Sequence, residues 1–192
     1  MNIELITAVC LGLGLSASCG FRVFIPLLVA AVAGKLGYLP LSQNFQWLAG
    51  WPAIICFASA GIFELLAYYI PFIDNLLDTL TTPLAVAAGT VLATSVLPVD
   101  NELLKWVTGI ILGGGSAATI QTGTSVLRLA STKTTAGIGN KYIATGEHAA
   151  ALGGSVLSLV IPIVIGAIVI LLIIYILVKL GGRMFATKGS GS

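Results

Sequence analysis

The chain has 192 residues, of which 57% are hydrophobic and only 8% are charged, and its formal net charge is +2. Because a soluble domain carries about 25% charged residues, this composition excludes an ordinary soluble protein. The small net charge also excludes the strongly basic surface that binds nucleic acid. The long apolar segments have helical rather than alternating patterns, so the fold class that we predict is an all-α integral membrane protein.

The first apolar segment, residues 3–37, contains an interruption. It is longer than the roughly 20 residues that cross a bilayer, yet too short for two full crossings. Small and polar residues gather at its centre and are followed by Pro26, which disfavours helix in the residue before it. We therefore predict one broken or strongly tilted helix, with its break at residues 20–26 and Arg22 inside the break.

A polar loop at residues 38–50 separates the first apolar segment from the second, which covers residues 52–70. Three aromatic residues around this loop are typical of the headgroup level of a membrane: Tyr38, Trp47 and Trp51. The second segment carries a single acidic residue, Glu64, well inside its apolar run.

Residues 71–80 have apolar side chains at helical spacing and polar ones between them. This pattern predicts a short amphipathic helix lying in the membrane interface, with Asp74 and Asp78 on its polar face. Thr82 and Pro83 then resemble the cap and first turn of a new helix, so we predict a third membrane segment at residues 83–97.

A fourth segment, residues 103–130, contains three consecutive glycines, which we interpret as a second interruption. The most polar part of the chain follows, at residues 131–148. Residues 149–180 are then apolar throughout, and they form either one long helix or two helices that turn near Pro162 or Gly166. The fold that we predict is a bundle of five to six transmembrane helices.

The two interrupted segments resemble each other, which suggests an inverted repeat. Three small residues of the first segment, Gly14, Ser16 and Ala17, match three of the fourth segment, Gly114, Ser116 and Ala117. Repeat units at residues 3–97 and 103–180 would give a 3+3 inverted arrangement, which places a binding site between two broken helices in many transporters. The alternative is that small residues recur because they allow membrane helices to pack closely.

The basic residues give the orientation. With six crossings, one side of the membrane carries both termini and most of the basic residues: Lys133, Lys141, Lys179, Arg183 and Lys188. Because cytoplasmic segments are enriched in Lys and Arg, this bias predicts that both termini lie in the cytoplasm, and it favours six helices over five. We assign residues 1–188 to a single transmembrane domain and residues 189–192, Gly-Ser-Gly-Ser, to an artificial linker.

Arg22 and Arg128 are the main candidates for substrate binding. Two guanidinium groups that face one cavity attract an anion, and free backbone N–H groups at broken helix ends add to that attraction. The alternative is that each arginine reaches the membrane interface and contacts lipid phosphates. Glu64 is a candidate for proton coupling, because a buried carboxylate can take up a proton, or it is a structural partner of Arg22.

Polar residues near the two interruptions complete the candidate substrate site: Ser16, Ser18, Ser116, Thr119, Gln121 and Thr122. Such side chains line polar paths, although Ser and Thr also bond the backbone of their own helix. Asp74 and Asp78 are assigned to a solvated polar face. Three cysteines and His148 lack metal-ligand spacing, so we expect no metal and no cofactor. Without a nucleophile and base pair, we expect no enzymatic activity.

Four stretches resemble the uncharacterised bacterial membrane protein family DUF4126: SCGFRVFIPLL, FELLAYYIPFIDNLLDTLTTPL, ASTKTTAGIGN and GEH. The resemblance covers most of residues 11–180, and its most specific parts include Gly20-Phe21-Arg22, Glu64, Asp74, Asp78 and Pro83. It implies a multi-pass membrane fold and a special status for these motifs, and it implies no particular substrate.

These observations lead to two hypotheses of different classes. The first is a small transporter or channel for an anion or an anionic small molecule, with its site between the two broken helices. We expect it in the bacterial inner membrane as a homo-oligomer, in contact with membrane lipids and with no nucleic-acid partner. The alternative is a non-transporting membrane scaffold or a lipid-interacting subunit of a larger complex.

Overall fold

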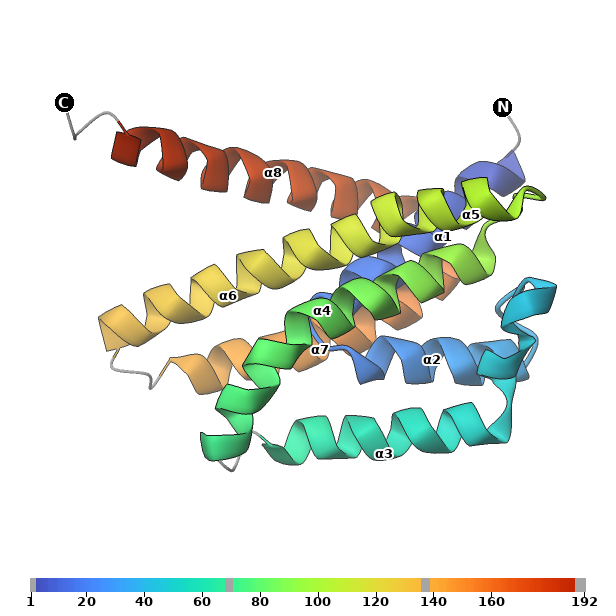
Figure 1. The fold of residues 1–192 in the computed structure, drawn as a ribbon, viewed down its shortest axis with the longest axis horizontal. Helices are drawn as coiled ribbons and strands as arrows, with labels where there is room; N and C mark the ends of the chain where they lie inside the picture. The colour runs from blue at the N-terminus through green and yellow to red at the C-terminus, as the bar shows by residue number, and fades with distance from the viewer. Residues whose placement is uncertain (1–2, 68–70, 136–138, 189–192) are drawn as a thin grey trace.

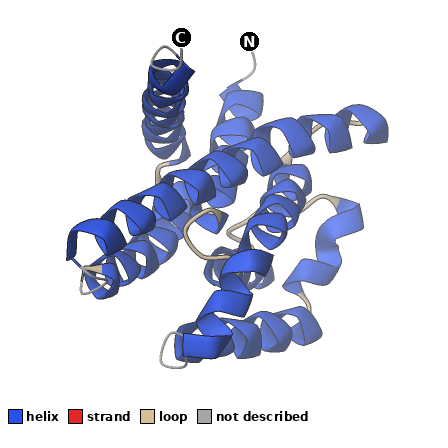
Figure 2. Ribbon diagram, turned by 60° about the vertical axis from the view of Figure 1, so that its left-hand side comes forward, coloured by secondary structure: helices blue, strands red, loops and turns tan. Residues whose placement is uncertain are grey.

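The structure, a computed structural model, describes residues 3–67, 71–135 and 139–188. Within these residues every regular element is a helix, as Figure 2 shows. The elements in chain order are α1 (Ile3–Cys19), α2 (Phe24–Lys35), the 3₁₀ helix η1 (Gln43–Ala49), α3 (Trp51–Ala67), α4 (Pro71–Val96), α5 (Glu102–Thr108), the π-helical segment η2 (Gly109–Gly114), α6 (Gly115–Thr135), α7 (Asn140–Val160) and α8 (Pro162–Lys188). The predicted all-α fold is confirmed.

The predicted break in the first apolar segment is confirmed at residues 20–23, between α1 and α2. The chain turns back there, and α2 returns towards the end of the bundle at which α1 begins (Figure 1). Leu11 of α1 and Leu39, just after α2, accordingly belong to one core cluster. The first segment is therefore a pair of antiparallel arms, and the expectation of a single broken crossing is wrong.

The predicted short helix at residues 71–80 is instead the first part of α4, which continues to Val96 with Pro83 in its interior. A proline removes one backbone donor and bends a helix without always ending it. The axis of α4 changes direction in its first half (Figure 1). Asp74 and Asp78 belong to this first part, and their side chains lie outside the described part of the chain.

The glycine-rich part of the fourth segment does not interrupt it. Helix α5, the π-helical segment η2 and α6 follow one another as a single path (Figure 1). A π turn widens a helix without breaking it, so the expectation of a second broken helix is wrong. The glycines serve close packing instead: a Cβ on Gly89 of α4 would lie 2.7 Å from the carbonyl oxygen of Gly113.

The last apolar region forms two helices, α7 and α8, and the turn near Pro162 is confirmed at Ile161. Helix α7 is antiparallel to α1, because Ser158 lies against Gly14 and Gly154 lies against Ser18. Helix α8 runs in the same direction as α1 (Figure 1), and Gly166 near the start of α8 lies against Cys10.

Helix α1 therefore begins at one end of the bundle, and α8 finishes at the other end (Figure 1). This arrangement does not fit the expectation that both termini lie on one side, because the reversal at residues 20–23 adds a change of direction. The two expected repeat units also differ in structure. Residues 3–97 contain α1 to α4 with a sharp turn, whereas residues 103–180 contain the continuous α5–α6 path, α7 and α8. The structure thus does not support a 3+3 inverted repeat.

Among the residues that the structure describes, two helical stretches are long and apolar enough to cross a bilayer, Glu102–Thr134 and Pro162–Lys179. A third is obtained if η1 and α3, which meet at an angle of 57°, are counted as one span. Large apolar side chains are exposed along α8, with Leu171 at 68% and Val178 at 70% exposure. A contiguous apolar surface of this kind is typical of contact with lipid or protein. The chain thus has the helical, apolar character of a membrane protein.

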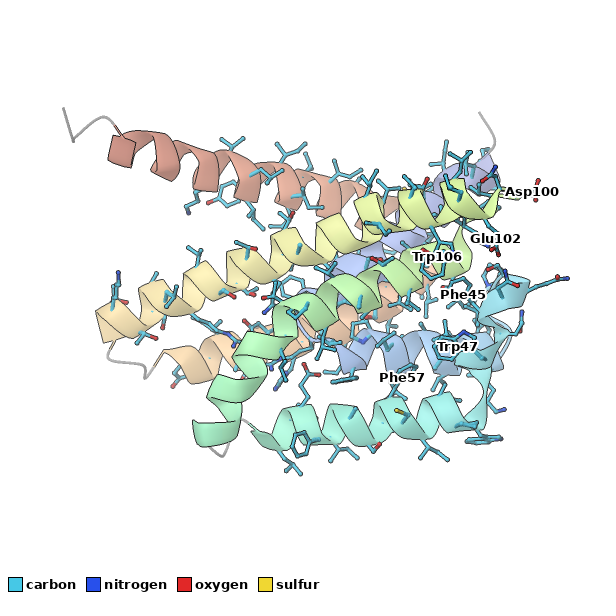
Figure 3. The ribbon with its side chains drawn as sticks, in the orientation of Figure 1. Phe45, Trp47, Phe57, Asp100, Glu102 and Trp106 are labelled. Carbon is cyan, nitrogen blue, oxygen red and sulfur yellow. The ribbon has the colours of Figure 1, made fainter. Side chains whose placement is uncertain are left out.

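Aromatic and charged residues gather at the end of the bundle where α4 ends and α5 begins (Figure 3). The rings of Phe45 and Trp106 have their centroids 5.7 Å apart. The Nζ of Lys35 lies 4.6 Å from the ring centroid of Trp51. Trp51, which we expect at the headgroup level, thus lies beside a positively charged group.

Small side chains bring α1, α4 and η2 together at the centre of the bundle. Ser16 is fully buried and donates a hydrogen bond of 2.7 Å from its hydroxyl to the carbonyl oxygen of Gly89. Gly89 in turn lies against Gly113, so that two helical backbones approach each other closely at this crossing. Membrane helices associate through such small-residue contacts because lipid provides no hydrophobic driving force between them.

We predict that Gly113→Ala destabilises the protein by about 1–3 kcal/mol, because the added methyl group meets the backbone of Gly89. Gly115→Ala is the matched control, since a Cβ at Gly115 has no neighbour within 4 Å. The control should be neutral or slightly stabilising, as alanine favours helix over glycine. Thermal unfolding of both variants in detergent measures the difference, and equal stability of the two would contradict this account of the crossing.

Candidate functional site

Three charged side chains meet in the interior near the turn between α1 and α2. Nη2 of Arg22 lies 3.2 Å from Oε2 of Glu147, and the two side chains are 7% and 4% exposed. Arg128, which is 20% exposed, donates from Nε to Oε1 of Glu147 at 3.0 Å and from Nη2 to Oε2. The convergence of Arg22 and Arg128, expected from the sequence as a condition for anion binding, is thus present around one carboxylate.

The local structure explains why Arg22 reaches this point. It lies in the connection between α1 and α2, where its backbone N–H donates to the carbonyl oxygen of Ser18. The preceding Gly20 allows close approach to α6, because a Cβ there would lie 2.6 Å from the carbonyl oxygen of Ala117. Arg128 lies three turns further along α6, on the same face of that helix as Ala117, and it meets Arg22 through their common partner Glu147.

Glu147 is the residue that sequence reasoning missed. We assigned residues 131–148 to a polar connection and regarded Glu64 as the acid inside an apolar span. Helix α7 begins at Asn140, so Glu147 lies two turns inside it. A signal was present in the sequence, because small buried residues of α7 recur on the same helical face: Ala144, Ala151, Ser155 and Ser158. Extending that face towards the start of the helix includes Glu147.

Glu64 of α3 stabilises the turn from the other side. Its Oε1 accepts a hydrogen bond of 3.2 Å from the backbone N–H of Val23, and its Oε2 accepts one of 3.3 Å from Phe24. These groups are at the start of α2, where helix N–H groups lack partners in their own helix and attract negative charge. Glu64 is 6% exposed, and it acts here as a cap supplied by a neighbouring helix.

A groove of about 420 Å³ between α2, α3 and α4 reaches Glu64. Phe24, Phe63 and Leu84 form apolar parts of its lining, and Ser59 adds a hydroxyl group. The groove therefore connects the surface of the bundle with the Glu64 carboxylate, which caps the start of α2. That capped position, at Val23, directly follows Arg22 in the chain.

A second groove, of about 300 Å³, lies between α6 and α8. Its lining is mostly apolar and includes Phe21 of the turn, Leu127 of α6 and Ile176 of α8. Lys179 also lines it, and its Nζ donates a hydrogen bond of 2.9 Å to the hydroxyl of Tyr175. The groove combines an apolar lining with an ammonium group.

The predicted hydroxyl residues bond mainly to helix backbone. Ser18, Ser116, Thr119 and Thr122 each donate to a carbonyl oxygen three or four residues earlier in the same helix. Ser16 bonds instead to α4, and Gln121 is buried on α6 at 5% exposure. The hydroxyls of Ser18, Ser116, Thr119 and Thr122 thus follow the alternative in which Ser and Thr bond backbone carbonyl groups of their own helix.

The comparisons with known proteins place the chain in a family. The family model described as "Domain of unknown function (DUF4126)" matches residues 9–181. The chain belongs to this family. The matched range contains Arg22, Glu64, Arg128 and Glu147. Neither the curated proteins nor the solved structures yielded a match.

Among the side chains that the structure describes in this DUF4126 protein, the site brings together charges of both signs. Arg22 and Arg128 carry two positive charges, and Glu64 and Glu147 carry two negative charges when they are ionised. Buried charges are costly unless they are paired and hydrogen-bonded. Among the residues that the structure describes, no group of three His, Cys, Asp or Glu side chains is placed to hold a metal ion. The chemistry that the site offers is the binding of carboxylates and related anions by two guanidinium groups.

We predict that Glu64→Ala destabilises the protein by about 1–2 kcal/mol, because two backbone N–H groups at the start of α2 lose their acceptor. Glu64→Gln retains an amide oxygen as acceptor and should lose clearly less. Unfolding of both variants in detergent gives the comparison. If glutamine and alanine were equally destabilising, the capping role would be excluded and the charge alone would matter.

Proposed function

We propose that this protein is a small membrane transporter or channel for an anion, with its binding site at the turn between α1 and α2. The observation that carries the proposal is the convergence of Arg22 and Arg128 on one buried carboxylate. Guanidinium groups inside an apolar membrane protein are costly, so their presence at a common point favours a functional role. The hydrogen bonds to Glu147 define where an anion would be held.

The grooves support a route to this point. The groove between α2, α3 and α4 reaches Glu64, and Glu64 holds the backbone of Val23 directly after Arg22. An anion or a proton that enters this groove arrives beside the turn. We therefore keep Glu64 as the candidate for proton coupling, since its carboxylate lines the groove and accepts a hydrogen bond from the residue that follows Arg22.

We infer an orientation from the basic residues and the direction of the helices. The end of the bundle where α6 and α8 finish carries Lys133 and Lys179, and Arg183 and Lys188 follow within α8. That end would face the cytoplasm of a bacterium, because cytoplasmic segments are enriched in Lys and Arg. The start of α1 would then face the other side of the inner membrane.

Flux measurements test the proposed function. We predict that purified protein in liposomes passes small anions under a set membrane potential, and that Arg22→Gln and Arg128→Gln each reduce this flux about 10-fold or more. The reason is that charge-assisted hydrogen bonds contribute roughly 1.5–3 kcal/mol to anion binding. Lys133→Gln is the control, because it removes an exposed positive charge of α6 outside the cluster.

The proposal is wrong if well-folded protein passes no chloride, nitrate, phosphate or formate under these conditions. If the arginine variants and Lys133→Gln passed equal anion flux, the protein would still be a transporter. The assignment of its binding site to Arg22 and Arg128 would then be wrong.

The second candidate is a lipid-interacting membrane subunit without transport activity. The specific observation in its favour is the groove between α6 and α8, whose apolar lining suits an acyl chain and whose Lys179 suits an anionic headgroup. The exposed apolar surface of α8 fits contact with lipid, with a second copy of the chain in a homo-oligomer, or with another subunit. Absence of flux would favour this candidate.

A further inference from the structure

Helices α6 and α8 contact each other at Gly123 and diverge beyond it. A Cβ on Gly123 would lie 2.9 Å from Cδ1 of Ile176, so the two helices are packed closely at this level. Both run in the same direction, and their ribbons separate towards their carboxyl ends (Figure 1). The groove of about 300 Å³ between them continues past this contact to Ala130 of α6 and Lys179 of α8. It is therefore a cavity between two helices that part from each other.

This groove has an apolar inner end and a charged outer end. Phe21 of the turn and Leu172 of α8 line the inner end, where both pack against the core cluster that contains Ile120. Lys179 lines the outer end, and it is the first charged residue of α8. Leu172 and Lys179 are separated by roughly 10 Å along a helix, whereas one leaflet of the hydrocarbon core is roughly 15 Å thick. The groove therefore fits into one leaflet, with Lys179 nearer the water.

Lys179 and Tyr175 form a pair of hydrogen-bond donors at the outer end. Nζ of Lys179 donates a hydrogen bond of 2.9 Å to the hydroxyl of Tyr175 and lies 5.2 Å from the centroid of its ring. An ammonium group has three N–H donors, of which this bond takes one, and a phenol hydroxyl that accepts a bond still has its own hydrogen to donate. Both side chains are exposed. Two adjacent donors with a positive charge suit two oxygens of one phosphate group.

We propose that this groove binds one anionic phospholipid, with its phosphate at Lys179 and Tyr175 and one acyl chain running inward to Phe21. Such a lipid carries its negative charge at the headgroup level and its apolar chain directly below, in the order in which the groove presents its ammonium group and its apolar lining. The inference rests on the lipid-interacting function proposed above as the second candidate, and it adds the lipid class and the residues of the site. Because Phe21 directly precedes Arg22, the bound chain also packs against the turn of the candidate anion site.

Thermal unfolding in detergent tests the proposal. The full chain is purified in dodecyl maltoside and titrated with phosphatidylglycerol, or with phosphatidylcholine that has the same acyl chains. The wild-type unfolding midpoint should rise by about 5 °C at saturating phosphatidylglycerol, as expected when a ligand fills one site, and clearly less with phosphatidylcholine. Lys179→Gln should need roughly 10-fold more phosphatidylglycerol for half of the rise, because it loses a charge-assisted hydrogen bond.

Lys105→Gln is the matched control for the charge. It removes the same positive charge from α5, at the opposite end of the bundle (Figure 1), and it should respond to phosphatidylglycerol as the wild type does. Equal stabilisation by the two lipids would overturn the proposal, and so would equal titration curves for Lys179→Gln and Lys105→Gln. Glycerol phosphate has the anionic headgroup without acyl chains and should give no rise. If it stabilised the protein as much as phosphatidylglycerol, the groove would not hold an acyl chain and the proposal would be wrong.

Ala130→Trp tests the groove itself. Ala130 is an exposed part of the lining, so a large side chain there fills the outer part of the groove and leaves Lys179 and Tyr175 unchanged. The variant should lose the rise with phosphatidylglycerol, and native mass spectrometry should detect one bound phosphatidylglycerol on the wild type and none on the variant. Bound lipid on Ala130→Trp would overturn the proposal. A wild-type dimer that Ala130→Trp dissociates would assign the groove to a second copy of the chain, which would also overturn it.

These measurements are independent of transport. Anion flux in liposomes would reject the non-transporting function of the second candidate and leave the lipid site in place. Lipid titrations without selectivity would reject the site and leave the flux result unchanged.

Discussion

The structure depends on the contact between the carboxylate of Glu147 and the guanidinium groups of Arg22 and Arg128. Each of these groups would be costly inside an apolar bundle on its own, and each is tolerated because it binds the others. The contact joins the turn between α1 and α2 to α7, where Glu147 lies 125 residues after Arg22, and to the neighbouring helix α6. It thus fixes the position at which the chain reverses, and the same position is the proposed anion site.

Small residues allow the helices to pack closely enough for this contact to form. Gly20 lets the turn lie against α6, and the crossing of Gly89 and Gly113 lets α4 and η2 approach at backbone distance. Glu64 then holds the start of α2 through two backbone N–H groups. The polar atoms of the site are therefore positioned by close backbone packing around them. This explains why a bundle with few charged residues can place four of them near one turn.

The sequence predicted the membrane character and the break after α1, and it singled out Arg22 and Arg128 as charged residues in apolar segments, because these follow from local chemistry. It did not predict that α2 turns back, that Pro83 lies inside α4 or that η2 continues the helix, because proline and glycine restrict the backbone without fixing its path. Glu147 was missed because its neighbours along the chain are polar, although its neighbours along the helix face are small and buried. Residue type shows which groups need partners, and only the packing shows which partners they find.

A double-mutant cycle tests the central contact most directly. The free energies of unfolding of wild type, Arg22→Gln, Arg128→Gln, Glu147→Gln and the two Arg–Glu double variants are measured under reversible conditions. If one carboxylate binds both guanidinium groups, each arginine should show a coupling energy with Glu147 of at least about 1 kcal/mol. Additive effects, with a coupling energy near zero for either arginine, would contradict the shared site on which this account depends.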